Sequence, residues 1–407
     1  MYDTDDPRAK AITQTIAEQI CIDMEPFDIV NKQGFQRTIK QLCPKYKMVS
    51  RPHISENVIP DIYCRVKTKI KELLQELPHI IVTTDLWTSD ASAFVNDFIS
   101  LTAHGINNNF ELKNYCLAVF PFEGERHSGE NIAENLRQLF QDWGIDEQVR
   151  ALVTDNAPNM GLAVTQVGME RIRCMAHSLQ LVLRDAFSGE EKINEMITKA
   201  RSIIGHFSHS TSGRKILTEM QKSHNVPCHV LIQDVVTRWD STLQALRRLL
   251  EQRVAVQASL PHVKCKTELA TEEESPHSTE APRQNQNDIF SGIWSACNSL
   301  IKEAEDDEPL SNMSIQPEQE EVESYLRFPN IPIKQDPKIY WRQEDKYSKL
   351  KKLAQKYLSY PMSSVASERL FSTAGLIQND LRNRLSADNL NKLCFLNKNL
   401  QKVNFNY

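Results

Sequence analysis

The 407-residue sequence lacks the features that mark several protein classes. It contains no run of 18 or more apolar residues, so we expect no membrane span. Its first ten residues, MYDTDDPRAK, lack the basic start and apolar stretch of a secretory signal, which predicts an intracellular protein. With a net charge of -5, it also lacks the excess of Lys and Arg typical of strongly basic nucleic-acid binders. Any contact with DNA must therefore use local basic patches.

Cysteine pairing is also absent from the sequence. The nine cysteines include no C-x-x-C pair and no zinc-finger spacing, which predicts reduced thiols in the cytosol or nucleus. Cys174 and His177 in CMAH are spaced like two zinc ligands on one helical turn, but a zinc site needs at least three protein ligands. We favour a structural role for this pair. Further ligands would have to come from His206, His209, Cys228 and His229.

Three acidic residues stand in distinctive contexts far apart in the chain: Asp85 in TTDLWTS, Asp155 in VTDNAPNM and Glu368 in SSVASERLFS. A short apolar run leads into each aspartate, which predicts a position at the end of a buried strand. Glu368 lies in a predicted helix that Ser363 or Ser364 could cap. Such carboxylates could hold two Mg²⁺ ions for phosphodiester cleavage. A strand-end aspartate that caps a turn is the alternative for each aspartate alone, but the three contexts together predict one site.

The order of predicted elements favours an α/β fold with a mixed sheet and flanking helices. Three strands, HIIVTTDLW, NDFISLTAHGI and ELKNYCLAVFPF, precede the helix SGENIAENLRQLFQDWGI and a fourth strand, QVRALVTD. This order places the two aspartates on adjacent central strands. Ile12, Ile16 and Ile20 recur at helical spacing and predict a helical lead-in before the sheet.

Composition divides the chain into four predicted segments. Residues 1–77 form the helical lead-in, and 78–260 form the first part of the core. Residues 261–323 contain TELATEEESPHSTEAPRQNQND, an acidic stretch with few apolar residues, which predicts a linker without a packed core. Residues 324–407 return to helical periodicity and complete the core.

These motifs resemble the hAT superfamily of DNA transposases and the BED-finger proteins descended from it. The resemblance rests on the three acidic motifs, RCMAHSLQLVLRDA, TRWDST and the C-terminal SSVASERLFSTAGLIQNDLRNRLSADNLNKLCFLNKNL, in the expected order. It implies an RNase H-like fold in which Asp85, Asp155 and Glu368 form a DDE triad that binds Mg²⁺. The sequence departs from the family pattern in two respects, because it encodes no zinc finger and has a short acidic linker where the family has a large helical insertion.

The C-terminal block resembles the hAT dimerisation region. Leu393, Leu396 and Leu400 recur at i, i+3 and i+7 as an apolar stripe on a predicted helix. Together with Leu370 and Phe371 they could belong to the core or to a dimer seam, and the resemblance favours both. We therefore expect a homodimer, or a heterodimer with a related hAT-derived chain.

The resemblance also places the RW element near the ends of a DNA strand. Arg238 could neutralise a phosphate while Trp239 stacks on an unpaired base. A tryptophan buried at a helix start is the alternative. Arg247 and Arg248, with Arg253, form a basic cluster on the following predicted helix, which could approach phosphate or be an ordinary solvated face.

Two functions follow from these observations. The first is a domesticated nuclear protein that dimerises and associates with DNA or chromatin, which the absent finger and shortened insertion favour. The second is an active DDE transposase that cleaves and transfers DNA strands with Mg²⁺, which the intact triad favours. The SERLFS block argues against a third class, a metal-dependent nuclease unrelated to transposition.

Overall fold

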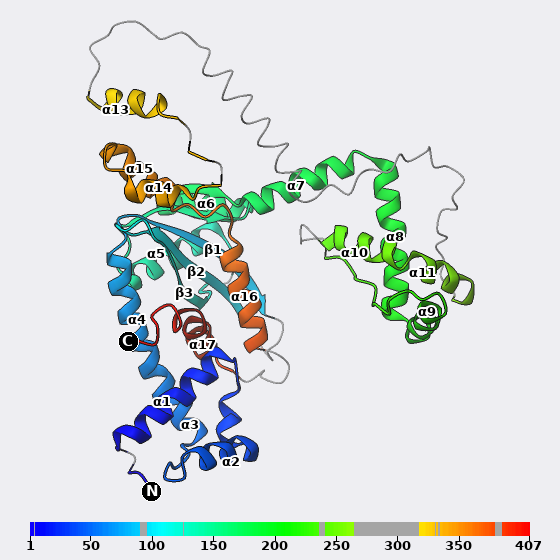
Figure 1. Ribbon diagram of the computed structural model, residues 1–407, viewed down its shortest axis with the longest axis horizontal. Coiled ribbons are helices and arrows are strands. Elements are labelled where there is room, and N and C mark those ends of the chain that lie inside the picture. The colour runs from blue at the N-terminus through cyan, green and yellow to red at the C-terminus, as the bar shows by residue number, and fades with distance from the viewer. Residues whose placement is uncertain are drawn as a thin grey trace, which may run out of the picture. The chain divides into compact units, whose positions relative to one another are not determined.

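The computed structural model describes residues 1–3, 5–89, 96–124, 126–235, 241–263, 317–329, 331–332, 334–378 and 385–407 (Figure 1). They form two compact units: unit 1 contains Met1–Val182 and Phe328–Tyr407, and unit 2 contains Leu183–Arg327. This division differs from the predicted segments, because the helical lead-in shares unit 1 with the sheet and the helices after Val182 form their own unit. Most of the predicted linker lies outside the described residues.

Unit 1 is built on a five-stranded sheet in the order β3-β2-β1-β4-β5, with β1 paired antiparallel to β2 and parallel to β4. β2 and β3 pair antiparallel, and β4 and β5 pair parallel. This confirms the predicted RNase H-like α/β fold with the two aspartate-bearing strands adjacent. The strands are β1 (Ile80–Ser89), β2 (Asn96–Ile106), β3 (Leu112–Pro121), β4 (Val149–Thr154) and β5 (Glu170–Arg173).

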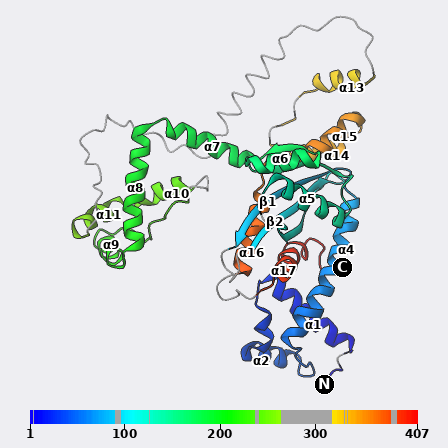
Figure 2. The same ribbon diagram turned by 180° about the vertical axis from the view of Figure 1, so that it is seen from behind.

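Helices flank the sheet in unit 1, and Figures 1 and 2 show α16 running beside β1 and β2. Before the sheet come α1 (Pro7–Ile22), η1 (Phe27–Asn31), α2 (Gln33–Leu42), α3 (Arg51–His53), η2 (Ile54–Val58) and α4 (Ile59–Gln75). After β3 come α5 (Gly129–Trp143), α6 (Pro158–Val167) and α7 (Met175–Ser188), which ends in unit 2. The C-terminal part supplies α14 (Pro337–Gln343), α15 (Ser348–Tyr357), α16 (Val365–Ile377) and α17 (Ala387–Asn399).

Local sequence explains where α5 begins and ends. The Ser128 hydroxyl accepts a hydrogen bond from the Asn131 N–H at 3.3 Å and so caps the first turn. The helix stops at Gly144, whose φ of +66° is a left-handed conformation that glycine adopts without a side-chain clash. The chain then turns directly into β4, the strand that delivers the second aspartate.

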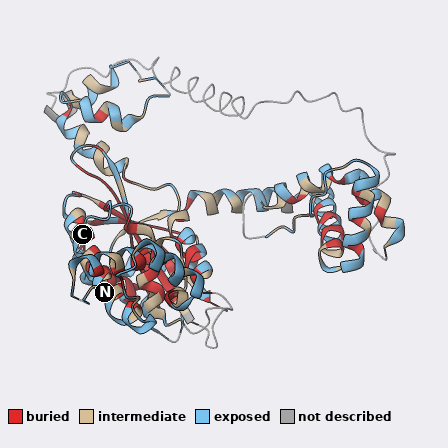
Figure 3. Cartoon of the chain, turned by 60° about the horizontal axis from the view of Figure 1, so that its bottom comes forward, coloured by how far each residue is buried: buried red, intermediate tan, exposed pale blue. Residues whose placement is uncertain are grey.

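Buried residues gather where helices pack on the sheet of unit 1 (Figure 3), and the two faces of the sheet belong to different clusters. Ile80 and Val82 of β1 belong to the main core, which also contains buried residues of α4 and α5. Because side chains alternate along a strand, Ile81 points to the opposite face, where it packs with Ala151 and Val153 of β4 in a smaller cluster. Asp85, four residues after Ile81, shares this second face.

Helix α17 covers β3, which is an edge strand of the sheet. Asn391 Oδ1 accepts a hydrogen bond from the Val119 N–H at 3.0 Å. The Asn399 amide both accepts from the Cys116 N–H at 3.2 Å and donates to the Cys116 carbonyl at 2.7 Å. These side chains satisfy backbone groups that an open edge would offer to another chain. Docking on β3 therefore explains why α17 packs into its own subunit.

All five residues predicted for the core, a dimer seam or both are buried in the chain's own core. The exposed fraction is 2% for Leu370, 7% for Phe371, 4% for Leu393 and 0% for both Leu396 and Leu400. An apolar stripe at helical spacing fits a core helix as well as an interface helix, and here α17 packs against β3, α1 and α4. Any seam between two copies must use other side chains.

The secondary structure of unit 2 is helical in its described residues, apart from connecting segments such as residues 226–235, and the unit has a core of its own. Ile203, Phe207, Leu217 and Val256 are buried together in that core. Its helices are α8 (Glu191–His209), α9 (Thr211–Ser223), α10 (Ser241–Glu251), α11 (Arg253–Ser259), η3 (Leu260–His262) and α13 (Pro317–Leu326). Across both units, no described helix combines the length and apolarity needed to cross a bilayer.

Candidate carboxylate site

Strand register places the two aspartates side by side. Thr83 of β1 pairs with Val153 of the parallel strand β4. Asp85 lies two residues after Thr83, and Asp155 lies two residues after Val153. Paired residues in a parallel sheet point to the same face, and a step of two preserves that face. Both carboxylates therefore lie on the face that α16 flanks. This matches the adjacent positions predicted from the sequence.

Helix α16 is fixed to β1 by contacts at alternate strand positions. Thr83 shares a hydrogen bond of 2.7 Å with Ser367, and the Trp87 ring stacks on Phe371 with centroids 5.7 Å apart. Farther along, the Ser89 hydroxyl donates to Gln378 at 3.1 Å. Asp85 occupies the position between Thr83 and Trp87, and Glu368 follows Ser367. The motifs TTDLWTS and SERLFS are thus the two sides of one contact.

The start of α16 differs from the expectation of a hydroxyl cap. Ser364 occupies the N-cap position, but its side chain accepts no capping hydrogen bond. Its N–H donates instead to the Cys174 sulfur at 3.4 Å, and the Cys174 N–H donates to the Thr154 carbonyl at 2.8 Å. Cys174 is fully buried, in keeping with the structural role favoured for it. It ties the helix that carries Glu368 to the strand that leads to Asp155.

The three carboxylates are close enough for their charges to interact. The pKa of Asp85 is raised from 3.8 to about 7, mainly by burial, and the negative charges of Asp155 and Glu368 raise it further. The Leu86 N–H, which donates to Asp85 Oδ1 at 2.9 Å, partly opposes this shift. No cationic side chain contributes to the shift, so Asp85 is a desolvated acid without a compensating positive charge.

The chemistry of this site fits a divalent cation, because carboxylate oxygens are the ligands that Mg²⁺ prefers. Asp85, Asp155 and Glu368 would supply those oxygens, and the bound charge would offset the burial of Asp85. Within the described part of the chain, however, no three His, Cys, Asp or Glu side chains are close enough to hold one ion. In the described residues, the three carboxylates are therefore near enough to influence the pKa of Asp85 but not close enough to share one ion.

Arg171 of β5 holds the loop that carries Asp155. Its guanidinium donates to the Asp155 carbonyl at 2.8 Å, to the Ala157 carbonyl at 3.2 Å and to the Thr154 hydroxyl at 3.2 Å. Gly161 of α6 makes room for it, since a Cβ there would lie 2.3 Å from Arg171 Nη1. The role of this arginine was not predicted from the sequence, because ERIR carries no motif that marks it.

The predicted DNA-binding residues fall partly outside the described chain. Arg238 and Trp239 lie outside it. Arg247 on α10 is exposed. Arg248 pairs with Glu251 at 2.8 Å and donates to the Val230 carbonyl at 2.8 Å, so it braces unit 2 internally.

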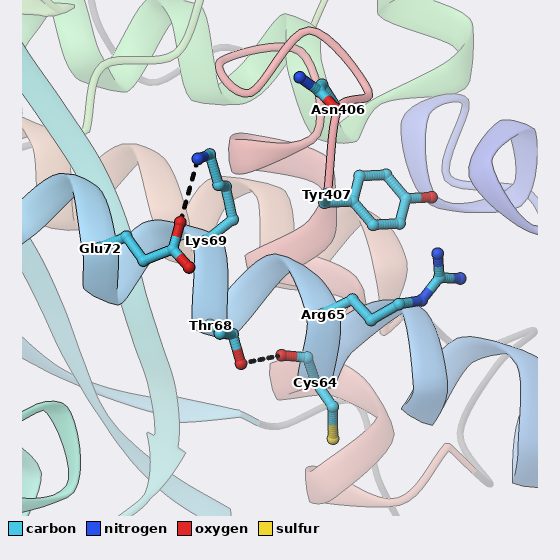
Figure 4. A pocket seen from close by; sticks show the side chains of 7 residues that line it. All are labelled: Cys64, Arg65, Thr68, Lys69, Glu72, Asn406 and Tyr407. Atoms are coloured by element: carbon cyan, nitrogen blue, oxygen red, sulfur yellow. Dashed lines mark hydrogen bonds and ion pairs between the residues drawn. The ribbon is translucent and has the colours of Figure 1, made fainter.

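A surface pocket of about 460 Å³ lies beside α4 in unit 1 (Figure 4). None of the three carboxylates lines it. Lys69 pairs with Glu72 at 3.0 Å, and Arg65 pairs with Asp61 at 2.8 Å while stacking over the Tyr407 ring. Its charged groups are thus already engaged. The lining residues are Cys64, Arg65, Thr68, Lys69, Glu72, Asn406 and Tyr407.

The fold and the convergent carboxylates define an RNase H-like α/β protein, and comparison with known families agrees. Residues 83–176 match the ZBED1 RNase-like domain, and residues 172–284 match the ZBED1 RNase-like helical domain. Residues 321–400 match the hAT family C-terminal dimerisation region. The chain is therefore a hAT-derived protein of the group that contains ZBED proteins and AC transposases.

The similar proteins include zinc finger BED domain-containing proteins and a putative transposase. The chain is similar to human zinc finger BED domain-containing protein 4, with 28% identity over 61% of this chain and 22% of the relative. Human zinc finger BED domain-containing protein 6 is 30% identical over 62% of this chain and 27% of the relative. A putative AC transposase from Zea mays is 27% identical over 57% of this chain and 30% of the relative. The matched region thus spans less than a third of each of these relatives.

Proposed function

We propose that this protein is a domesticated, hAT-derived nuclear protein that self-associates and associates with DNA or chromatin. The observation that carries the proposal is the match of residues 321–400 to the hAT family C-terminal dimerisation region, in a chain similar to zinc finger BED domain-containing proteins.

Relatives support the nuclear and DNA-associated parts of the proposal. The similar proteins are named as zinc finger BED domain-containing proteins and as putative transposases. The matched dimerisation region, residues 321–400, supports self-association. Because Leu393 and Leu396 are buried, the seam would use exposed apolar side chains of that region, such as Leu376 and Met362, which are both 63% exposed. A light-scattering mass of one chain at micromolar concentration would contradict self-association.

The alternative function is an active DDE transposase. The hydrogen bond between Thr83 and Ser367 favours it, because it joins the residue next to Glu368 to β1, the strand that carries Asp85. Asp85, Asp155 and Glu368 would hold Mg²⁺, which when bound activates a water or a 3′-hydroxyl and stabilises the leaving oxygen. The chain's own contribution is to hold the three carboxylates on β1, after β4 and on α16, which packs against β1.

A cleavage assay separates the two functions. We expect weak or absent cutting of linear duplex DNA in Mg²⁺ or Mn²⁺, together with measurable DNA binding in the same buffer. Asp155→Asn removes one ligating charge with little change in shape, and Asp146→Asn, at an exposed position, is the matched control. Robust cutting that Asp155→Asn abolishes and Asp146→Asn leaves unchanged would refute domestication and establish the enzyme.

A further inference from the structure

Helix α15 carries a concentrated positive charge in a chain whose net charge is -5. Its sequence, SKLKKLAQKY, contains four lysines and no acidic residue. Lys349, Lys352 and Lys356 recur at i, i+3 and i+7 and therefore share one side of the helix. Lys349 and Lys352 are exposed, Lys356 is half-buried, and the adjacent Tyr357 is 58% exposed. We call these four side chains the α15 face.

Nearby acidic groups do not neutralise Lys352 or Lys356. Asp345 pairs with Lys351, on another side of the helix, at 2.9 Å. Asp336 pairs with Lys338 at 2.9 Å. Within the described residues, neither Lys352 nor Lys356 forms an ion pair, and the Lys356 ammonium instead lies 5.2 Å from the Tyr357 ring centroid.

Further cations extend the face onto the sheet. Arg150, near the start of β4, and Lys356 both lower the pKa of His79, although burial is the larger cause. Lys356 of α15 and Arg150 of β4 therefore both act on His79, the residue before β1. Cations of α15 and β4 create a local positive potential, although the net charge of the whole chain is negative.

The C-terminal end of α15 is fastened to β2, so the helix is held in place. The Gln355 amide donates to the Ile106 carbonyl at 3.0 Å, and the Ser359 hydroxyl accepts from the Ile106 N–H at 3.0 Å. Arg342, at the end of α14, donates to the Asn109 carbonyl at 2.6 Å. A rigidly mounted row of lysines loses less conformational freedom on binding than lysines on a loop.

The segment that follows α15 lies on the carboxylate side of the sheet. Tyr360, three residues after α15, packs against Ile81, Ala151 and Val153, which share the face that carries Asp85. Ile81 and Asp85 are four residues apart on one strand, or about 13 Å at the usual rise. A polyanion that passes over the carboxylates could therefore reach α15 without leaving this side of unit 1.

We propose that the α15 face binds the phosphate backbone of duplex DNA, and so positions that DNA across the carboxylate face. This inference rests on the proposed association with DNA and names the surface responsible. A second copy of the same face is a poor occupant, because in a twofold contact its lysines would meet lysines. The matched dimerisation region thus contains one helix whose exposed charges suit an anionic partner.

The test compares two variants with the same loss of charge. Lys349→Gln/Lys352→Gln/Lys356→Gln removes the cations of the α15 face. The control changes three exposed lysines of the N-terminal part of unit 1, as Lys40→Gln/Lys45→Gln/Lys47→Gln. Binding of a fluorescein-labelled random duplex of about 30 base pairs is followed by anisotropy at several NaCl concentrations, in EDTA so that no metal contributes. Unchanged melting temperatures establish that both variants fold.

Each phosphate contact contributes about 0.9 to the slope of log affinity against log salt concentration. We expect the α15 variant to lose about 2 to 3 from this slope and at least tenfold in affinity near 0.1 M salt, while the control keeps the wild-type slope. An unchanged slope in the α15 variant, or an equal loss in the control, would overturn the inference. Capture of polyglutamate through the same lysines, with DNA binding intact, would assign the face to an acidic protein and overturn it as well.

The unmodified chain distinguishes the two proposals. If it does not bind duplex DNA at any salt concentration, the proposed association with DNA fails, and this inference fails with it. If it binds and the α15 variant binds equally well, only the role of α15 fails.

Discussion

Thr83 and Ser367, 284 positions apart in sequence, share a hydrogen bond of 2.7 Å between their hydroxyl groups. Thr83 also contacts Thr102 at 2.5 Å, and Thr102 contacts the ring of the buried His104 at 2.7 Å. A continuous polar chain therefore runs through the core from β2 to the helix that carries Glu368. Buried polar groups that are fully paired fix one arrangement of the elements that they join.

Ser367→Ala should loosen the attachment of α16. It removes one hydrogen bond while Thr83 keeps its contact with Thr102, so we expect a loss of about 0.5 to 1.5 kcal/mol in the free energy of unfolding. Ser372→Ala, on an exposed position of the same helix, should change it by less than about 0.5 kcal/mol. Urea titration of both variants measures the difference, and equal effects would mean that the Thr83 contact adds nothing.

Asp85→Asn should stabilise the metal-free protein at alkaline pH. Because the folded state raises the pKa of Asp85 from 3.8 to about 7, the favourable contribution of the protonated acid is complete below pH 3.8 and is lost as pH rises through 7. The amide stays neutral throughout. We expect a gain of about 1 to 3 kcal/mol at pH 8 that shrinks towards pH 5.

Chemical denaturation at several pH values in EDTA tests this prediction. Asp146→Asn, at an exposed site, is the control and should show no such dependence on pH. A stabilisation by Asp85→Asn that is the same at pH 5 and pH 8 would mean that Asp85 does not titrate in this range.

Gly161→Ala should displace Arg171 from the Asp155 loop. Alanine normally stabilises a helix interior relative to glycine by about 0.5 to 1 kcal/mol, and Gly205→Ala in α8, where a Cβ meets nothing within 4 Å, should show that gain. We expect no gain at Gly161, because the new Cβ moves the guanidinium off its acceptors. In an Arg171→Met background the gain should return, and a double-mutant cycle by thermal unfolding measures this coupling.

Leu396→Ala should unfold the subunit more readily. Leu396 is fully buried, so truncation should lower the free energy of unfolding by about 2 to 5 kcal/mol. Leu376→Ala, also within the matched dimerisation region but 63% exposed, should have little effect on unfolding. A seam built on Leu396 predicts the reverse: loss of the dimer in light scattering with little change in the unfolding of the monomer.

Periodicity and motif context made much of unit 1 predictable from sequence. Alternating and continuous apolar runs identified the strands, and the order of elements gave the adjacency of the strands that lead to Asp85 and Asp155. The convergence of Glu368 was predicted from its motif context. The contact of Ser367 with Thr83 brings α16 to the sheet. This contact depends on which face of α16 packs on the sheet, and that face could not be predicted from one sequence.

Three features could not be predicted from the sequence, for physical reasons. The stripe of Leu393, Leu396 and Leu400 gave no means to tell a core helix from an interface helix, because both need the same spacing. The role of Arg171 was invisible, because its partners are mostly backbone carbonyls, and any residue type supplies those. The cap predicted at Ser364 is absent, and the backbone of Ser364 (φ -80°, ψ 9°) is not in the extended conformation usual at an N-cap.

The interruption of unit 1 by unit 2 has a consequence for how the protein is made. The ribosome must synthesise residues 183–327 after β5 has emerged and before α16 and α17 exist. At about 5 to 20 residues per second this interval lasts roughly 7 to 30 s, far longer than a chain needs to collapse. Throughout it, the edge of β3 lacks Asn391 and Asn399, so the nascent chain presents an unpaired strand that chaperones or neighbouring nascent chains could bind.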